Sequence, residues 1–200
     1  MKIAILGASG RTGRLVADLA VERGHHVVAL VRGDPPAARD GVTIAKGLAT
    51  DKADVARALA GCEAVISCLA STNSEAVCSK ATDAVIAANG PRRYLTVGGA
   101  GIDAEGDEKG FGDKVVGAIM KVVVGKMLAD RQKELATLQS STLEWTMARP
   151  PRLTDKPGRD YRTSLQKPPS TAIGREALAA FLVDELEQGA FVRKAPFVAT

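Results

Sequence analysis

The N-terminal sequence KIAILGASGRTG, residues 2–13, decides the fold. An apolar run from Ile3 to Leu6 is followed directly by glycines at positions 7, 10 and 13. A strand that ends in Gly-x-x-Gly-x-x-Gly and opens a helix is typical of a dinucleotide-binding loop, although an ordinary tight turn between a strand and a helix can also contain glycines. In such a loop the free N–H groups at the start of the helix meet the phosphates. We therefore expect cofactor contacts from the whole loop: Gly7, Ala8, Ser9, Gly10, Arg11, Thr12 and Gly13.

Each glycine of the loop has its own role in this prediction. Gly7 permits the tight turn, and Gly13 lets the helix pack close to the strand. Gly10 removes a Cβ that would keep the backbone away from the pyrophosphate.

Beyond this loop, short apolar runs alternate with longer segments of helical periodicity. The patterns predict strands at 3–6, 26–31, 42–45, 64–69, 93–97, 143–147 and 191–198, and helices at 12–23, 51–60, 75–88, 113–138 and 175–187. Such alternation indicates a mainly parallel sheet with right-handed crossovers. We predict an α/β fold, a single doubly wound Rossmann domain over residues 1–200 with six or seven strands. Its ligand lies beyond the carboxyl ends of the strands, and residues 98–170 supply the substrate pocket.

Composition fits a soluble globule that binds a small anionic ligand. Of the 200 residues, 46% are hydrophobic and 25% charged, and the formal net charge is +4. The basic residues are spread out without interleaved aromatics, which disfavours nucleic-acid binding. No stretch of 18 uncharged apolar residues occurs, so we expect no membrane span. The nearest such stretch, residues 115–128, is interrupted by Lys121 and Lys126.

The cysteines and the N-terminus indicate a cytoplasmic protein. Cys62, Cys68 and Cys78 are odd in number and form no Cys-x-x-Cys pair, so we expect neither disulfides nor a metal site. The apolar run at the N-terminus is too short for a signal peptide. No interface pattern is readable, and a monomer is slightly favoured.

The end of the second predicted strand selects the cofactor. An Asp or Glu about 20 residues past the glycines would favour NAD. Here the strand ends in Val31-Arg32, and the guanidinium of Arg32 suits the 2′-phosphate of NADP(H). Arg11 and Arg39 could add charge. Asp34 lies close and keeps NAD(H) open, and Arg32 could also be a solvated loop residue.

These motifs resemble the atypical short-chain dehydrogenases/reductases, and especially their NAD(P)H-dependent branch that includes biliverdin-IXβ reductase, also called flavin reductase. The resemblance covers nearly the whole chain. Its carriers are residues 2–13, Val31-Arg32, Ala64-Val65-Ile66 before Cys68, and the segment ARPPRLTD at 148–155. The glycine motif is shared by a broad group, whereas the double proline followed, after three residues, by Asp155 is more particular to this branch.

The resemblance implies further cofactor contacts. Cys68, Leu69 and Ala70 are expected along the adenosine and ribose. Val97 and Gly98 should flank the nicotinamide, with Pro150 and Pro151 lining its pocket. Leu48 follows Gly47 where the family often has Gly-Asp, so only apolar contact is expected there.

Two departures concern the catalytic side chains. The flavin-reductase branch commonly has Thr-Ser where this chain has Gly98-Gly99, and a His where it has Arg152. The Tyr-x-x-x-Lys pair of ordinary short-chain dehydrogenases is also missing, since Gly98 follows Tyr94 and Leu165 follows Tyr161 at that spacing. The two histidines, His25 and His26, precede the second strand, and we expect them at the surface.

The remaining candidates for catalysis are Arg152 and Tyr161. Arg152 could stabilise a developing anion or hold an acidic substrate group, unless it belongs to a solvated basic loop with Lys156, Arg159 and Arg162. Tyr161 could donate a proton only if that loop folds back over the pocket. The apolar stripe within residues 115–128 could be core or a pocket wall.

The sequence favours an NADPH-dependent oxidoreductase that transfers hydride to a flavin, quinone, tetrapyrrole or similar conjugated small molecule. A delocalised acceptor spreads the incoming charge over its rings, so it needs a positioned acid less than a simple ketone does. Two alternatives stay open: a non-catalytic NADP(H)-binding redox sensor, and a biosynthetic oxidoreductase acting on an aromatic polyketide.

Overall fold

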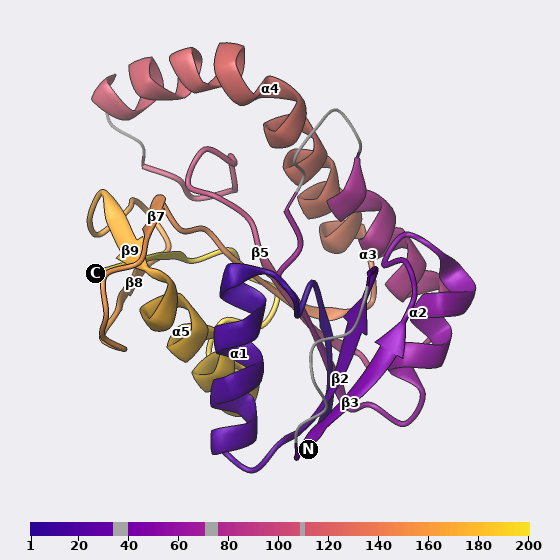
Figure 1. Ribbon diagram of the computed structural model, residues 1–200. Coiled ribbons are helices and arrows are strands. Elements are labelled where there is room, and N and C mark those ends of the chain that lie inside the picture. Colours follow the sequence, from indigo (N-terminus) through magenta and orange to yellow (C-terminus); the bar gives the residue numbers. More distant parts are fainter. Residues whose placement is uncertain (34–39, 71–75, 109–110) are drawn as a thin grey trace.

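Six parallel strands form the centre of the molecule, in the order β3-β2-β1-β4-β5-β6 (Figure 1). The structure is a computed structural model that describes residues 1–33, 40–70, 76–108 and 111–200, and the side chains of all of these except 111–124. The strands are β1 (Lys2–Leu6), β2 (His26–Val31), β3 (Val42–Lys46), β4 (Ala64–Ser67), β5 (Arg93–Val97) and β6 (Glu144–Ala148). This order reverses between β1 and β4, which is where a doubly wound sheet binds its ligand.

The central strands are apolar throughout because helices cover both faces of the sheet. Along β1, Ile3 and Ile5 belong to one hydrophobic cluster, and Ala4 and Leu6 to the other. All four are fully buried. The apolar pattern therefore predicted this strand correctly.

In the described part of the chain, five helices form the two outer layers. Helices α1 (Arg11–Glu22) and α5 (Arg175–Gln188) lie side by side on one face, and α2 (Lys52–Leu59), α3 (Val77–Ala87) and the C-terminal part of α4 (Phe111–Ser140) cover the other (Figure 1). No helix in the described ranges is long and apolar enough to cross a bilayer. The predicted helices are confirmed, with ends that shift by a few residues.

The C-terminal quarter of the chain differs from the prediction. The segment between the predicted strand at 143–147 and the predicted helix at 175–187, in which no strand was predicted, contains β7 (Arg152–Thr154) and β8 (Arg162–Ser164). Strand β7 pairs in parallel with β9 (Ala172–Gly174), and β8 pairs antiparallel with β10 (Phe197–Ala199). Of the predicted strand at 191–198, only residues 197 and 198 lie in a strand, β10. The segment nevertheless runs parallel to β6 at the edge of the main sheet, where Met147 N donates to the Lys194 carbonyl and Arg149 N to the Pro196 carbonyl.

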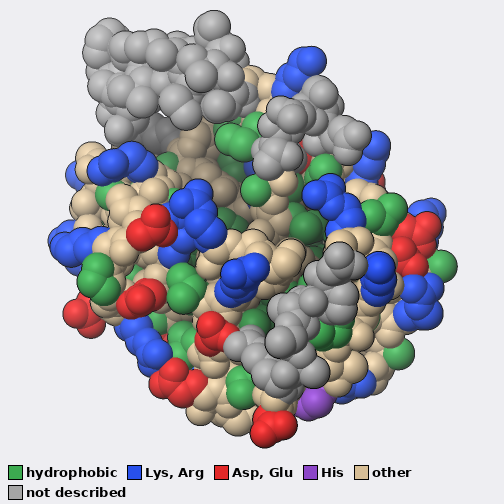
Figure 2. Space-filling view, in the orientation of Figure 1, with side chains coloured by type: hydrophobic (Ala, Val, Ile, Leu, Met, Phe, Trp, Pro, Cys, Tyr) green, Lys and Arg blue, Asp and Glu red, His purple; other side chains and the backbone are tan. Residues whose placement is uncertain are grey.

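Charged side chains of both signs are interspersed over the face in Figure 2, with no single basic patch.

One expectation about the histidines at the amino ends of the strands is wrong. His25 is buried and its ring Nε2 lies 2.9 Å from Glu187 Oε1 on α5, whereas His26 is exposed as predicted. Because His25 directly precedes β2 and His26 is its first residue, both lie away from the carboxyl ends of the strands.

Candidate active site

The glycine loop between β1 and α1 has the geometry of an anion site. Gly7 has φ +80°, which favours glycine, and a Cβ on Gly13 would collide with the Gly7 carbonyl oxygen. The helix begins after Gly10 with no side-chain cap and no acidic residue in its first turn. Its first N–H groups thus remain available to a phosphate, and the helix dipole favours negative charge there.

A cavity of about 250 Å³ opens at the carboxyl ends of β4 and β5, beside this loop. Thr12 reaches it from α1, and Leu153 from β7. The remaining wall comes from the segments after β4 and β5 and from α4: Cys68, Leu69, Ala70, Val97, Gly98, Gly99, Ile102, Met127, Leu128 and Arg131. Nearly all of these residues are apolar or small, so the cavity suits a planar ring system more than a polar chain.

The cavity gathers six of the residues predicted to bind cofactor. They are Thr12, Cys68, Leu69, Ala70, Val97 and Gly98. Arg32 and Leu48 follow the neighbouring strands β2 and β3 at the same edge of the sheet, and both are exposed. Asp34 and Arg39 lie outside the described residues.

The double proline does not line the cavity as expected. Pro150 is buried, and its carbonyl accepts a hydrogen bond from Ala100 N at 2.9 Å. Leu153, two residues after Pro151, lines the wall instead. Pro150 thus contacts the loop that follows β5 instead of lining the cavity.

Neither predicted catalytic side chain is brought to the cavity. Arg152 is exposed on β7 and is not part of the wall. The Tyr161 hydroxyl donates to Asp184 Oδ2 at 2.8 Å, and its ring packs edge-on against Phe181 of α5. Burial and this hydrogen bond to Asp184 raise the Tyr161 pKa, which makes it a poorer acid. The basic loop therefore does not fold back over the pocket, and its Arg159 pairs with Glu22 of α1.

The two glycines after β5, Gly98 and Gly99, have different surroundings. A Cβ on Gly98 would lie 2.6 Å from Ile102 Cδ1 and 2.9 Å from Met147 Sδ, so a side chain there would have to displace these two buried side-chain ends. At Gly99 no described residue lies within 4 Å of such a Cβ. Packing thus favours glycine at position 98, whereas Gly99 borders open space among the described residues.

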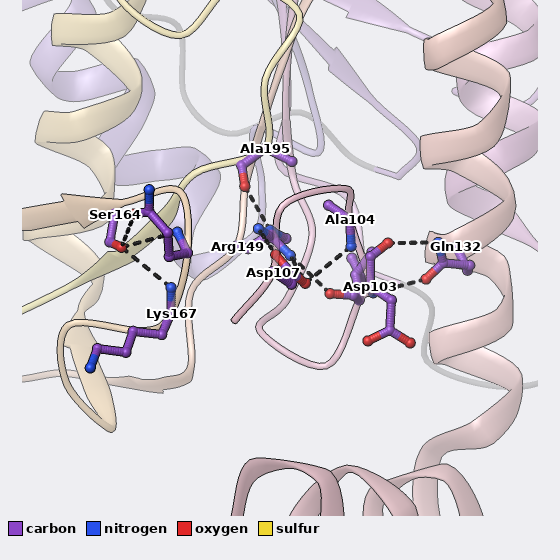
Figure 3. Close-up of polar contacts among 10 residues, drawn as sticks. Asp103, Ala104, Asp107, Gln132, Arg149, Ser164, Lys167 and Ala195 are labelled. Carbon is purple, nitrogen blue, oxygen red and sulfur yellow. Dashed lines mark hydrogen bonds and ion pairs between the residues drawn. The ribbon is translucent and has the colours of Figure 1, made fainter. Parts of the chain in front are cut away.

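The loop after β5 is held from several sides (Figure 3). Arg149, the residue before the double proline, is 1% exposed and makes a bidentate ion pair with Asp107 at 2.7 and 2.8 Å. Its Nε donates to the Ala195 carbonyl, and Gln132 of α4 exchanges two hydrogen bonds with the Asp103 backbone. These contacts fix the loop that carries the cavity glycines.

Asp155, the last residue of the ARPPRLTD segment, contacts two other elements. Its carboxylate accepts a hydrogen bond from Arg175 at the start of α5 and lies 3.7 Å from exposed Arg11 of the glycine loop. The segment therefore joins the cavity wall, α5 and the dinucleotide loop.

Arg131 of α4 is a cavity residue that the motif analysis missed. It is 7% exposed, and its guanidinium donates to Glu134 Oε2 at 2.6 Å and to the Leu69 carbonyl. The signal was present in the helical spacing, since residues 128, 131, 135 and 138 lie on one face and the other three are leucines. A charge on an otherwise apolar stripe needs a partner or a ligand. Of the stripe predicted within 115–128, the side chains before 125 lie outside the described residues, and Leu128 is a wall residue.

The thiol in the cavity wall is unreactive by environment. Burial raises the pKa of Cys68 to about 12, against a smaller opposing effect of Arg131. All three cysteines are free thiols. Within the described part of the chain, no cluster of His, Cys, Asp and Glu side chains could hold a metal ion.

Strand order, glycine loop and cavity together define a Rossmann-fold nucleotide-binding protein. Residues 7–189 match the protein family described as NAD(P)H-binding, and the chain belongs to this family. No curated protein matches the sequence closely enough to count as a relative.

Solved structures of similar proteins share this fold over the whole chain. A candidate exported protein from Burkholderia pseudomallei is 31% identical, with complete coverage of both chains and a TM-score of 0.78. A candidate NADH-flavin reductase from Streptococcus pneumoniae is 24% identical (TM-score 0.76; 100% of this chain and 99% of that chain). A short-chain dehydrogenase/reductase from Veillonella parvula in complex with NADP is 21% identical (TM-score 0.77; 100% and 94%).

Proposed function

We propose that this protein is an NADPH-dependent reductase that transfers hydride to a conjugated ring acceptor such as a flavin, quinone or tetrapyrrole. The observation that carries the proposal is the apolar cavity in which Thr12 of the dinucleotide loop meets the ends of β4 and β5. A cofactor whose pyrophosphate lies on the uncapped start of α1 would bring its nicotinamide to this cavity.

In this proposal the bound cofactor supplies the hydride, and the protein supplies position and environment. The glycine loop holds the pyrophosphate. Val97, Leu128 and Leu153 present an apolar wall that excludes water from the reacting rings. The open space at Gly99 admits a planar acceptor against the nicotinamide face.

The polar groups of the wall favour a delocalised acceptor over a simple ketone. Thr12, Cys68 and Arg131 carry the polar side-chain atoms on the described wall. The Cys68 thiol holds its proton too tightly to act as a general acid near neutral pH. An acceptor that spreads the incoming charge over its rings can take its proton from solvent.

NADPH is the proposed cofactor because of Arg32. The guanidinium is exposed at the carboxyl end of β2, where the adenosine ribose of a dinucleotide is expected. A free guanidinium can contact a 2′-phosphate, whereas an acidic residue would bind the ribose hydroxyls. The proposed compartment is the cytoplasm, where NADPH is available and free thiols persist.

The test is stopped-flow oxidation of NADPH and NADH with FMN, riboflavin, a quinone and biliverdin, followed by the nicotinamide absorbance. We expect fast oxidation of NADPH with at least one acceptor. The matched control is Gly10→Val, in which a side chain projects from the loop toward the pyrophosphate position while the fold is kept. No oxidation by the wild type with any acceptor would overturn the proposal.

A non-catalytic redox sensor is the second candidate, favoured by the absence of an ordinary acid from the described cavity wall. The same experiment separates the two. Tight NADPH binding by wild type without oxidation, lost in Gly10→Val, would favour the sensor over the proposed reductase. A biosynthetic reductase of an aromatic polyketide would give that result too, until its own substrate is added.

A further inference from the structure

Arg131 is held in the cavity wall by two fixed partners on opposite sides. Its Nη1 donates to Glu134 on its own helix, and its Nη2 to the carbonyl of Leu69 after β4. These bonds use two of the five N–H groups of a guanidinium. The others remain for a ligand in the cavity, which Arg131 lines.

Glu134 fixes this orientation from the core. It is fully buried, and besides Arg131 it accepts hydrogen bonds from Thr96 Oγ1 at 2.8 Å and Thr82 Oγ1 at 3.2 Å. The neighbouring Asp130 accepts hydrogen bonds from the N–H groups of Cys78 and Ser79 at the start of α3. Because α4 is tied in this way to β5 and α3, the guanidinium is preorganised.

The charge on Arg131 is permanent and is concentrated by its surroundings. Burial is the largest single effect and opposes the charge, but the Glu134 carboxylate together with neighbouring groups raises the Arg131 pKa above its ordinary range. Within the part of the chain that the structure describes, Arg131 is the one charged residue lining this apolar cavity. A fixed cation in such a site acts strongly on a developing anion, because little water screens it.

We propose that Arg131 stabilises the negative charge that the acceptor gains when hydride arrives, and that Glu134 is its positioning residue. This inference rests on the proposed function. Hydride moves with both electrons from the reduced nicotinamide, which is oxidised, to the acceptor, which becomes an anion. Solvent then supplies the proton. The substrate class is therefore a planar acceptor whose reduced form carries charge on a ring oxygen or nitrogen, as quinones and flavins do.

The first test compares binding of two ring compounds to the NADP⁺-loaded protein by calorimetry. One is 2-hydroxy-1,4-naphthoquinone, which is an anion at neutral pH with charge shared by its oxygens. The other is the neutral 1,4-naphthoquinone. We expect the wild type to prefer the anion, and Arg131→Gln to reduce that preference about 10- to 100-fold, as for loss of one charge-assisted hydrogen bond.

Three further variants separate charge stabilisation from folding. Arg131→Lys keeps the charge and should retain part of the preference. The double variant Arg131→Gln/Glu134→Gln removes both buried charges together, so it should fold while still lacking the preference. Arg92→Gln removes an exposed cation at the opposite end of β5 and should change nothing.

Kinetic measurements distinguish an effect of Arg131 on the acceptor from an effect on the cofactor. We expect Arg131→Gln to lower kcat while the Kd of NADPH stays unchanged. A weakened Kd of NADPH with an unchanged anion preference would make Arg131 a cofactor contact and overturn the inference. If Arg131→Gln turns over as fast as the wild type, the inference about Arg131 is overturned, but the proposal of a reductase is retained. Anion preference without any wild-type turnover would overturn the reductase and leave an anion site.

Discussion

Arg32 tests the cofactor proposal at the level of a single residue. Replacing it with Ala should weaken NADPH binding about 10- to 100-fold, because a charge-assisted hydrogen bond to the 2′-phosphate is lost. NADH has no such phosphate, so its affinity should hardly change. Calorimetry with both cofactors measures this, with Arg57→Ala, an exposed arginine of α2, as control. An equal loss for both cofactors would show that Arg32 does not read the phosphate.

Gly98 and Gly99 provide a matched pair of substitutions. Gly98→Ala places a Cβ against Ile102 and Met147 and should lower the free energy of unfolding by about 1–3 kcal/mol. Gly99→Ala enters open space and should be close to neutral. Urea unfolding of both variants measures the difference. Equal stabilities would mean that the loop can shift and that Gly98 is not required by packing.

The glycine turn between β1 and α1 could be predicted because its spacing is local. The lining of the cavity could not, because it depends on contacts between distant segments. Arg152 lies in a recognisable motif but is exposed to solvent. Arg131 instead donates a hydrogen bond to the Leu69 carbonyl, 62 positions earlier in the chain. Only the helical spacing of Arg131 with leucines marked it in the sequence.

At the scale of elements, the long periodic segments were predicted correctly and the short ones were missed. Helices and central strands carry a period that extends over their length. Strands β7 to β10 have three residues each. Strand β7 pairs with β9, and β8 with β10, in each case across a long separation in sequence. A three-residue strand has no readable period, so its pairing is set by tertiary contacts alone.

The Arg149–Asp107 pair joins the cavity loop to β6 and carries a prediction of its own. Asp107→Ala should cost about 3–5 kcal/mol in the free energy of unfolding, because it leaves a buried guanidinium without its anion. Glu22→Ala removes a bidentate partner from the surface residue Arg159 and should cost much less, because solvent screens an exposed pair. Urea unfolding compares the two. Similar costs would mean that Asp107 does not hold the loop.

At the scale of the whole molecule, the sheet order follows from two facts readable in the sequence. The glycine loop identifies the first strand, and the alternation of strands and helices places the rest in right-handed crossovers. The site then forms where the order reverses, between β1 and β4. The cavity beside this point is lined in part by α4 and β7, whose positions the alternation does not determine.

The stability of the whole molecule should fall at alkaline pH partly through Cys68. Its pKa is about 12 in the folded state because of burial, against about 8.5 in an unfolded chain. Between these values unfolding releases a proton, so rising pH favours the unfolded state. The contribution is fully present below about pH 8.5 and is lost at roughly 1 kcal/mol per pH unit above it.

Cys68→Ala removes this group and should therefore show a shallower decline. Urea unfolding of the wild type and the variant between about pH 7 and 10 measures the two slopes. Cys62→Ala is the matched control, because the Lys2 ammonium partly offsets the effect of burial on that thiol and its slope should change less. If Cys68→Ala and the wild type lose stability in parallel above pH 8.5, the Cys68 thiol must be solvated in the native protein. The apolar character of the cavity wall beside the dinucleotide loop would then be wrong at that point.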